Sequence, residues 1–376
     1  MREIVFVYEN KDGFLGGVQS NILAIAEALL ERKMLQPILL TANPVSRFGE
    51  AFRVLGGRIY GARISGPGGL RRGRDALLEI ADRHDVAVVE GDMFRESMVA
   101  RMFRRRRPGI QHVFRVHTHL DGRIPGWGRR AMHRTLDRLT CRHVNAFVPI
   151  SNVVADELHF KSGAPRDKIH VVRNGVVAPG DADFSPGGGA PLPPAVAVVG
   201  DLMERKQQLA AVRAVGALHA RGIDVHLHIV GDDRENILPE IKAAAQDMAI
   251  EKLVHIHGYL DREHLGNVLA DVSVVTLPSL FEGTPTSIIE GMAMRKVVVT
   301  TPVGGTPEFV KDGVNGFLHS PRDEASLIAI LERVLTTPAS QWNALRDRAH
   351  QTWRDLFSLD SMIDGLQTVY RHLGVI

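Results

Sequence analysis

The sequence contains a single cysteine, Cys141, among its 376 residues. One cysteine excludes an intramolecular disulfide and a four-thiolate metal site, which is typical of a reducing compartment. The longest apolar runs have the length of a strand, well short of the roughly 20 residues that a membrane-spanning helix needs. The segment MREIVFVYE also lacks the apolar region and cleavage site of a signal peptide. These absences exclude a disulfide-bonded secreted scaffold and an integral membrane protein, so we expect a cytoplasmic protein.

A net charge of +3 conceals an uneven distribution of charge along the chain. Residues 1–175 hold 29 Lys and Arg against 18 Asp and Glu, whereas residues 176–376 hold 17 against 25. The excess is concentrated in residues 101–142, which contain 12 arginines and only two acids, Asp121 and Asp137. This region is either a solvated helical face or a surface for an anionic partner, such as an acidic acceptor or an anionic membrane surface.

Nucleic acid is not an expected partner of this chain. The sequence contains no zinc-finger, basic-zipper or RNA-recognition motif. Aromatic residues, on which unpaired bases stack, make up only 6% of the chain. A basic region without these features favours an anionic surface of another kind.

Short apolar segments alternate with helical patterns along the whole chain. The first series of expected strands comprises residues 3–9, 36–42, 86–91, 112–118, 146–150 and 169–173. Residues 178–194 are rich in Gly, Pro and Asp, which is the composition of a linker. The second series of expected strands comprises residues 195–200, 225–231, 253–259, 272–278 and 296–302. Two series of strand–helix units separated by a linker predict two parallel-sheet α/β domains.

This pattern predicts the boundaries of the domains. We expect an N-terminal domain at residues 1–176, a linker at 177–194 and a C-terminal domain at 195–355. A final helical segment, 356–376, is expected to cross back to the N-terminal domain. Ligands of open parallel sheets bind beyond the carboxyl ends of the strands, so two such domains facing each other would form a deep cleft.

The stretch from residue 278 to residue 310 is the most specific signal in the sequence. Glu282 directly follows an expected strand, and Glu290 comes eight residues later inside an expected helix. The unpaired amides and the positive dipole at the start of that helix can bind phosphate. A carboxylate beside them can accept hydrogen bonds from sugar hydroxyls. The stretch therefore predicts a site for a sugar linked to a diphosphate.

Five motifs in this order and spacing resemble glycosyltransferase family 4. Glu282 and Glu290 match the E-x7-E motif of that family. The other matching segments are Gly16-Gly17-Val18, Val172-Arg173-Asn174-Gly175-Val176, Val199-Gly200 followed by Lys206, and Gly304-Gly305-Thr306-Pro307-Glu308 with Gly313-Val314-Asn315-Gly316. The resemblance covers nearly the whole chain. It implies an α/β GT-B fold, in which two Rossmann-like parallel-sheet domains face each other across a cleft, and retaining hexosyl transfer from a nucleotide-diphosphate sugar.

The resemblance implies a donor site on the C-terminal domain. Glu290 would accept hydrogen bonds from the donor ribose, Glu282 would hold the donor sugar, and Lys206 would neutralise the diphosphate as it leaves. The nucleotide base would lie against the backbone after the strand 253–258, so the side chains do not distinguish UDP from GDP or ADP. The further residues implied to contact the donor are Gly17, Arg205, Gly258, Leu260, Gly283, Thr284, Thr286 and Ser287.

The resemblance also implies a histidine on the N-terminal domain that faces the donor sugar. The expected strand 112–118 ends near His117 and His119, and we expect His117 to be the catalytic one, with His119 as the alternative. The acceptor would be a glycan, a lipid-linked saccharide or a small molecule, as in polysaccharide biosynthesis. The residues expected to bind it are Gly16, Gly17, His119 and Arg123.

The sequence departs from the family at one position. The family usually has an arginine directly after the glycine that ends the donor-phosphate strand, and this chain has Asp201 there. Either Asp201 points away from the diphosphate and Arg205 supplies the second cation, or the protein binds the phosphate in an unusual or weakened way. Asp201 is also the only feature that favours a non-catalytic protein that binds a sugar nucleotide or a partner protein.

No metal ion and no other cofactor is expected, because the lysine, the arginine and the helix dipole can neutralise the diphosphate. His117 and His119 are too few ligands for zinc. The triplet Asp181-Ala182-Asp183 resembles a metal-binding D-x-D motif but lies in the expected linker. A nucleotide-sugar epimerase is a further alternative on this fold, and the E-x7-E motif argues against it.

Overall fold

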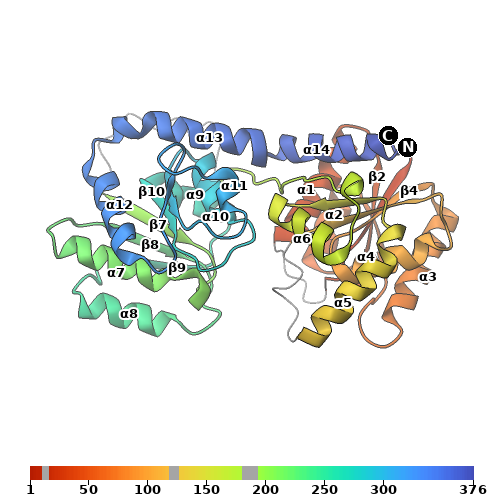
Figure 1. Cartoon of the computed structure of the whole chain (residues 1–376), viewed down its shortest axis with the longest axis horizontal. Coiled ribbons are helices and arrows are strands. Elements are labelled where there is room, and N and C mark those ends of the chain that lie inside the picture. Colours follow the sequence, from red (N-terminus) through yellow and green to blue (C-terminus); the bar gives the residue numbers. More distant parts are fainter. Residues whose placement is uncertain (11–16, 118–126, 180–193) are drawn as a thin grey trace. The chain divides into compact units, whose positions relative to one another are not determined.

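The computed structural model describes residues 1–10, 17–117, 127–179 and 194–376 (Figure 1). The chain divides into two compact units. Unit 1 comprises residues 1–175 together with 359–376, and unit 2 comprises residues 176–358. Each unit is built around one six-stranded parallel sheet.

The sheet of unit 1 has the strand order β3-β2-β1-β4-β5-β6. Its strands are β1 (Glu3–Val7), β2 (Gln36–Thr41), β3 (Arg58–Gly61), β4 (Val86–Gly91), β5 (Gln111–Val116) and β6 (Ala146–Pro149). The helices of unit 1 are α1 (Gly17–Glu31), α2 (Arg47–Val54), α3 (Gly69–Arg83), α4 (Phe94–Arg104), α5 (Trp127–Thr140), α6 (Asn152–Ser162) and α14 (Leu359–His372), with short 3-10 helices η1 (Cys141–His143) and η2 (Arg166–Lys168). The strand order reverses direction between β1 and β4, which is where ligands bind in sheets of this type.

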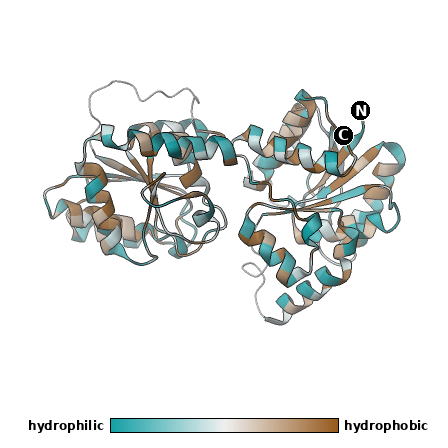
Figure 2. Cartoon of the chain, turned by 45° about the horizontal axis from the view of Figure 1, so that its top comes forward, coloured by the Kyte–Doolittle hydropathy of each residue, from teal (hydrophilic) through white to brown (hydrophobic). Residues whose placement is uncertain are grey.

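The strands of unit 1 are apolar because helices cover both faces of the sheet. Ile4 and Phe6 of β1 lie in one core cluster with residues of α1 and α14, whereas Val5 and Val7 lie in another with residues of α3 and α4. This alternation follows from the two-residue period of a strand. Figure 2 shows the result as hydrophobic central strands beneath helices of mixed character.

The sheet of unit 2 has the strand order β12-β11-β10-β7-β8-β9. Its strands are β7 (Ala195–Val199), β8 (His226–Val230), β9 (Val254–Gly258), β10 (Val274–Leu277), β11 (Val297–Thr300) and β12 (Phe317–Leu318). Its helices are α7 (Gln208–His219), α8 (Leu238–Asp247), α9 (Arg262–Asp271), α10 (Thr286–Ala293), α11 (Thr306–Phe309), α12 (Glu324–Thr336) and α13 (Asn343–Phe357), with η3 (Glu204–Lys206) and η4 (Ala339–Trp342). Among the described residues, no helix has both the length and the apolarity to span a bilayer.

The strand predicted at residues 169–173 is wrong. Ile169 forms only an isolated bridge with Phe147 of β6. The amides of His170 and Val172 donate to the carbonyls of Phe147 and Pro149, so the segment follows β6 with too few paired residues to form a strand. Two short strands, β3 and β12, were not among the predicted ones because their sequences lack a long apolar run.

Side-chain caps begin several of the helices. Ser46, Ser151 and Asp261 each accept a hydrogen bond from an amide in the first turn of α2, α6 and α9, respectively. Such caps satisfy donors that would otherwise lack partners. Helix α10 differs, because Pro285 precedes it and supplies no side-chain cap.

Helix α14 is fixed to unit 1 by a buried polar contact as well as by its apolar face. The Tyr370 hydroxyl donates a 2.8 Å hydrogen bond to Oε2 of Glu90 on β4, and neither residue is exposed. Burial raises the pKa of Glu90, and the positive charge of Arg115 opposes this shift. Loss of the tyrosine hydroxyl would therefore leave a buried carboxyl group with one partner fewer.

We predict that Tyr370→Phe lowers the free energy of unfolding by about 1–3 kcal/mol, because a buried acceptor loses its donor. Urea unfolding of the full chain measures this change. Thr368→Ala, on the exposed side of the same helix, is the control and should change stability by less than about 0.5 kcal/mol. Equal effects of the two substitutions would contradict the role assigned to the buried contact.

Candidate functional site

Lys206 lies against the carboxyl end of β7. The strand ends at Val199, and Gly200 follows with a φ of +142°. The positive φ favours glycine, and a Cβ atom on Gly200 would lie 2.8 Å from Nζ of Lys206, so a side chain here would displace the lysine side chain. The turn η3 carries Arg205 next to Lys206. Two adjacent cations are thus held at the end of a central strand.

The Glu282 carboxylate faces both of these cations. Its Oε1 atom lies 3.2 Å from Nζ of Lys206 and 3.3 Å from Nη1 of Arg205. The Ser279 hydroxyl donates to the same oxygen over 2.9 Å. Only 10% of the Glu282 side chain is exposed, whereas 41% of that of Arg205 is. Glu282 contacts both cations, and Lys206 also lies near the carboxyl group of Glu290, whose pKa is raised to about 7. Below that pH this cation pair, Arg205 and Lys206, retains an excess of positive charge.

The N-terminus of α10 adds further hydrogen-bond donors close in sequence to Glu282. The first helical hydrogen bond runs from the Ile289 amide to the Pro285 carbonyl. The amides of Thr286, Ser287 and Ile288 therefore precede the hydrogen-bond ladder of the helix, at the positive end of its dipole. In the described part of the chain, the buried hydroxyls of Thr284 and Thr306 have no hydrogen-bond partner. A bound polar ligand would satisfy groups of this kind.

Glu290 lies in the second turn of α10. Burial raises the pKa of its carboxyl group to about 7, and the positive charges of Arg262 and Lys206 oppose the shift. Arg262 begins α9, and its Nη2 atom donates a 3.0 Å hydrogen bond to the Ala178 carbonyl. The motif at 282–290 predicted Glu290 but gave no signal for Arg262, which lies 28 positions earlier in the sequence.

A glycine-rich loop at residues 304–305 contacts the backbone of Glu282 and Gly283. Gly304 has a φ of +56°, and a Cβ atom on it would lie 1.8 Å from the carbonyl oxygen of Glu282. The Gly305 amide donates a 2.8 Å hydrogen bond to the Gly283 carbonyl. The motif at residues 304–308 therefore positions the motif at 282–290 by direct backbone contact.

Asp201, which stands at the usual arginine position, is paired with a different arginine. Its Oδ2 atom accepts a hydrogen bond from Nε of Arg234 over 3.3 Å, and Arg234 also donates to Asp232 over 3.1 Å. Arg205 contacts Glu282 instead. Asp201 therefore shares the positive charge of Arg234 with Asp232. Nothing in the sequence separated Arg234 from other surface arginines.

The residues expected to bind the base lie at the end of β9. Gly258 ends the strand with a φ of +66°, and its carbonyl accepts a 2.8 Å hydrogen bond from the Gly231 amide. Leu260 packs partly buried against the core of unit 2. Gly283, another residue expected to contact the donor, lies after β10. No atom lies within 4 Å of the position that a Cβ atom on Gly283 would take, so its surroundings are open. Their roles toward a donor stay predictions.

In unit 1, His117 follows β5 and is held by two polar partners. Its Nε2 atom lies 3.0 Å from Oδ1 of Asp92, which follows β4. Its Nδ1 atom lies 3.4 Å from Nδ2 of Asn174. The Asn174 oxygen accepts a 2.9 Å hydrogen bond from Arg115, so the amide nitrogen is directed to the ring. The ring therefore accepts at Nδ1 and donates from Nε2 to Asp92.

Asp92 was not among the candidates from the sequence. It is fully buried. Burial raises the pKa of its carboxyl group, against the positive charge of Arg115. The strand order brings the ends of β4 and β5 together and with them Asp92 and His117, although the two residues are 25 positions apart.

Several of the predicted residues lie outside the described part of the chain. These are Gly16, His119, Arg123, and the triplet 181–183. Gly17 is described and begins α1, where it is exposed. The described residues contain no group of three or more His, Cys, Asp or Glu side chains arranged to hold a metal ion.

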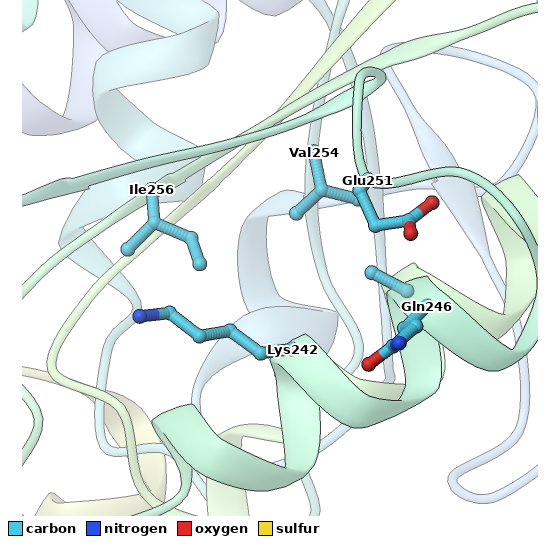
Figure 3. A pocket seen from close by; sticks show the side chains of 6 residues that line it. Lys242, Gln246, Glu251, Val254 and Ile256 are labelled. Atoms are coloured by element: carbon cyan, nitrogen blue, oxygen red, sulfur yellow. The ribbon is translucent and has the colours of Figure 1, made fainter.

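A pocket of about 350 Å³ lies between α8 and β9 (Figure 3). It is lined by Lys242, Ala245, Gln246, Glu251, Val254 and Ile256. The residues expected to bind the donor are not among these, so this pocket is distinct from the site around Glu282.

Comparisons with known proteins assign the chain to a family. The model described as "Glycosyl transferase 4-like domain" matches residues 16–175, and the model described as "Glycosyl transferases group 1" matches residues 193–337. Together the two models span most of the chain. The chain belongs to the group 1 glycosyltransferases, which is consistent with its resemblance to family 4.

Among curated proteins, the chain is similar to alpha-D-kanosaminyltransferase from Streptomyces kanamyceticus. The two are 24% identical over 251 residues, which cover 64% of this chain and 63% of that protein. The matched part of this chain spans about half to two thirds of the length of such relatives.

Solved structures resemble the whole chain and show the fold. A glycosyltransferase from Rickettsia africae has a TM-score of 0.83 at 19% identity, covering 99% of this chain and 98% of that one. Anabaena HepE in complex with UDP has a TM-score of 0.79 at 16% identity, with each chain fully covered. Each unit is therefore a Rossmann-like domain, and the fold is GT-B, as predicted.

We predict that Gly304→Ala destabilises the chain by about 1–3 kcal/mol more than Gly313→Ala, because only at Gly304 does the new methyl group overlap the Glu282 backbone. Both glycines have a positive φ, +56° and +68°, so both variants carry the strain of that conformation. Gly313 has open space around its Cβ position and serves as the control. Equal urea midpoints for the two variants would show that the contact between the two motifs does not matter.

Proposed function

We propose that this chain transfers a hexosyl group from a UDP- or GDP-linked sugar to a hydroxyl group of a saccharide, lipid-linked or small-molecule acceptor, with retention at the anomeric carbon. The observation that carries the proposal is the cation pair, Arg205 and Lys206, on the single carboxylate of Glu282. The excess positive charge and the nearby amides of α10 together suit a diphosphate.

Each group of the site has a part in this reaction. Lys206 and Arg205 stabilise the negative charge that develops on the diphosphate as it leaves, which is commonly a large catalytic contribution. The amides at 286–288 and the hydroxyls of Thr284 and Thr306 supply further donors for the diphosphate and the sugar. Glu290 accepts hydrogen bonds from the ribose hydroxyls. No divalent metal ion is needed to neutralise the diphosphate in this scheme.

The transfer step proceeds on one face of the sugar. The bond between the anomeric carbon and the diphosphate oxygen breaks, and a bond to the acceptor oxygen forms on the same face. The proton of the acceptor hydroxyl passes to the leaving diphosphate, so no separate side-chain base is required. His117 contacts the donor sugar in this scheme, and Asp92 and Asn174 hold its ring in one orientation, which favours catalysis by preorganisation.

The donor nucleotide and the compartment are also proposals. HepE from Anabaena, which shares the fold, binds UDP in its crystal structure. This supports UDP-linked sugars as the first donors to test on this chain. The single cysteine, Cys141, supports a reducing, cytoplasmic location.

The pairing of Asp201 weakens the case for a non-catalytic protein. An unpaired aspartate at the diphosphate site would repel the donor. Arg234 lies within hydrogen-bond distance of Asp201, and each side chain is a little less than half exposed. Arg234 also contacts Asp232, so it compensates the negative charge of Asp201 in part. This partial compensation favours an active enzyme.

The release of nucleoside diphosphate from UDP-glucose, in the presence of saccharide acceptors, tests the proposal. We predict that Lys206→Ala lowers this turnover by about 100-fold or more, because it removes a cation from the leaving group. Lys252→Ala, an exposed lysine of the same unit, is the control and should retain wild-type turnover. If Lys206→Ala and Lys252→Ala are equally active, the role of Lys206 is wrong.

Glu290 makes donor binding depend on pH. Its pKa is about 7 in the free protein, and ribose hydroxyls donate to its ionised form. We therefore predict that the affinity for UDP-glucose rises as the pH increases through 7, by at most about tenfold per pH unit. UDP-glucose is suitable because its diphosphate keeps the same charge over this range.

Calorimetric titration at several pH values measures this dependence, and Glu290→Gln should make the profile flat. The raised pKa also predicts that the contribution of Glu290 to stability falls as the pH rises from 4.5 to 7, because over this range this carboxyl group binds more protons in the folded state than in the unfolded state. The difference in the free energy of unfolding between wild type and Glu290→Gln, measured by urea unfolding at several pH values, isolates this contribution. If the affinity for UDP-glucose depends on pH in the same way for wild type and Glu290→Gln, the role of Glu290 in donor binding is wrong.

A further inference from the structure

Four polar side chains share one face of the unit 1 sheet at the ends of two neighbouring strands. Glu90 and Asp92 lie two positions apart at the end of β4, as do Arg115 and His117 at the end of β5. Side chains with this spacing point to the same face of a sheet. All four are buried. Ionisable groups are unfavourable in a protein interior unless they are paired, so the contacts among these four decide how each is held.

Arg115 connects Glu90 to Asn174. Its Nη2 atom donates a 2.9 Å hydrogen bond to Oδ1 of Asn174, and its Nε atom lies 3.7 Å from Oε1 of Glu90. A planar guanidinium held at both ends has one orientation. The Asn174 amide is then fixed as well, because its oxygen faces Arg115 and its nitrogen lies 3.4 Å from Nδ1 of His117.

Helix α14, which lies beside α1 in unit 1 (Figure 1), holds the same group from another side. Its Tyr370 hydroxyl donates to the second carboxylate oxygen of Glu90 over 2.8 Å. Its Met362 sulfur lies 3.9 Å from Nη2 of Arg115 and 3.1 Å from the Gly175 amide nitrogen. Helix α14 therefore holds both the guanidinium and the loop that the guanidinium contacts.

Arg115 also acts on Asp92, the partner of the other nitrogen of the His117 ring. Burial raises the pKa of the Asp92 carboxyl group, and the positive charge of Arg115 opposes this shift. The carboxyl groups of Glu90 and Glu96 lie near enough for Asp92 to raise the pKa of both. The charge of Arg115 thus helps to keep Asp92 ionised among other acids. An ionised carboxylate accepts the proton on Nε2 of the ring, 3.0 Å away.

We propose that Arg115 is a positioning residue of the transferase, which fixes the hydrogen-bonding state of His117 at both ring nitrogens. Through Asn174 it keeps Nδ1 an acceptor, and through its charge on Asp92 it keeps the proton on Nε2. The proposal rests on the role of His117 in the proposed function. It adds that one buried residue, itself held by α14, selects the tautomer of that ring.

A ring that loses either partner can rotate or exchange tautomer. The nucleotide and the diphosphate are expected on unit 2, so such a ring would still allow the donor to bind. Catalysis is more sensitive, because misplacement by about 1 Å can lower a rate by about 100-fold. Loss of Arg115 is therefore expected to lower kcat much more than it raises the KM for the donor.

The nitrogen NMR spectrum of the full chain with isotope-labelled histidine tests the positioning directly. A neutral imidazole carries its proton on one nitrogen, and the spectrum shows which. The signal of His117 is identified by its loss in His117→Gln, and we expect its proton on Nε2 in the wild type. Arg115→Lys keeps the buried charge but lacks the fork that reaches Asn174, so it should give a mixture of tautomers. Arg115→Met loses the charge as well and should change the signal further.

The release of UDP from UDP-glucose, in the presence of saccharide acceptors, measures the consequence for turnover. We expect kcat to fall about 10-fold in Arg115→Lys and about 100-fold in Arg115→Met, with less than about a threefold change in the KM for UDP-glucose.

Arg101→Lys and Arg101→Met are the matched controls. Arg101 is also a buried arginine of unit 1, and its Nη1 atom lies 2.7 Å from a carboxylate oxygen of Asp137. In the described part of the chain, its hydrogen bonds do not reach Asn174 or His117. These variants should lose stability, as urea unfolding shows, but keep the wild-type His117 signal and kcat.

Three results would overturn the proposal. The wild type carries the proton on Nδ1 of His117, or folded Arg115→Lys keeps both the wild-type signal and the wild-type kcat. In the third, the Arg101 variants lower kcat as much as the Arg115 variants do, which would assign the effect to lost stability. Should Arg115→Met fail to fold, Arg115→Lys decides, because it retains the buried charge. A wild type without turnover would count against the proposed function instead, and the His117 spectrum would still show whether Arg115 positions the ring.

Discussion

The contact of one carboxylate, Glu282, with two cations, Arg205 and Lys206, is the interaction on which the candidate donor site depends. Three segments meet there: the turn after β7, the loop after β10 and the glycine loop before α11. The turn after β7 carries the two cations, and the loop after β10 carries the carboxylate. The glycine loop contacts the backbone of Glu282 through Gly304. The contact orients the cations and leaves part of their charge uncompensated, which is the property that an anion-binding site requires.

The two parallel sheets explain why functional groups gather where they do. In unit 2, Lys206 and Glu282 follow β7 and β10, which are neighbours in the sheet. In unit 1, Asp92 and His117 follow β4 and β5, which are also neighbours. Parallel strands place their carboxyl ends at one edge, so residues distant in sequence become adjacent there. Both sheets have the same order of strands, with the direction of winding reversed between two central strands.

Much of the fold could be predicted from the sequence, because each buried parallel strand is an apolar run bounded by polar or glycine-rich segments. The same signal gave a wrong prediction of a strand at residues 169–173. Ile169 and Val172 pack against core residues, and the segment forms too few paired residues for a strand. The motif spacing between Glu282 and Glu290 predicted the loop and helix, because both residues lie within one local element. Within such an element, sequence distance is a guide to spatial distance.

The contacts that could not be predicted join different elements. Asp201 pairs with Arg234 across 33 positions, and Asp92 contacts His117 across 25. No local pattern distinguishes these partners from other charged residues, since their proximity follows from strand order alone. The orientation of α5 was hidden for a similar reason. Its arginines were visible in the sequence, but the buried pair of Arg101 and Asp137 depends on the packing of α4 against α5.

The most direct test of the account is a calorimetric titration of the unmodified chain with UDP, GDP and ADP in the presence of a metal chelator. The account predicts that at least one of these nucleotides binds at one site per chain without a divalent metal ion, because Arg205, Lys206 and the start of α10 neutralise its diphosphate. Failure of all three nucleotides to bind, or binding that appears only when a divalent metal ion is added, would contradict it.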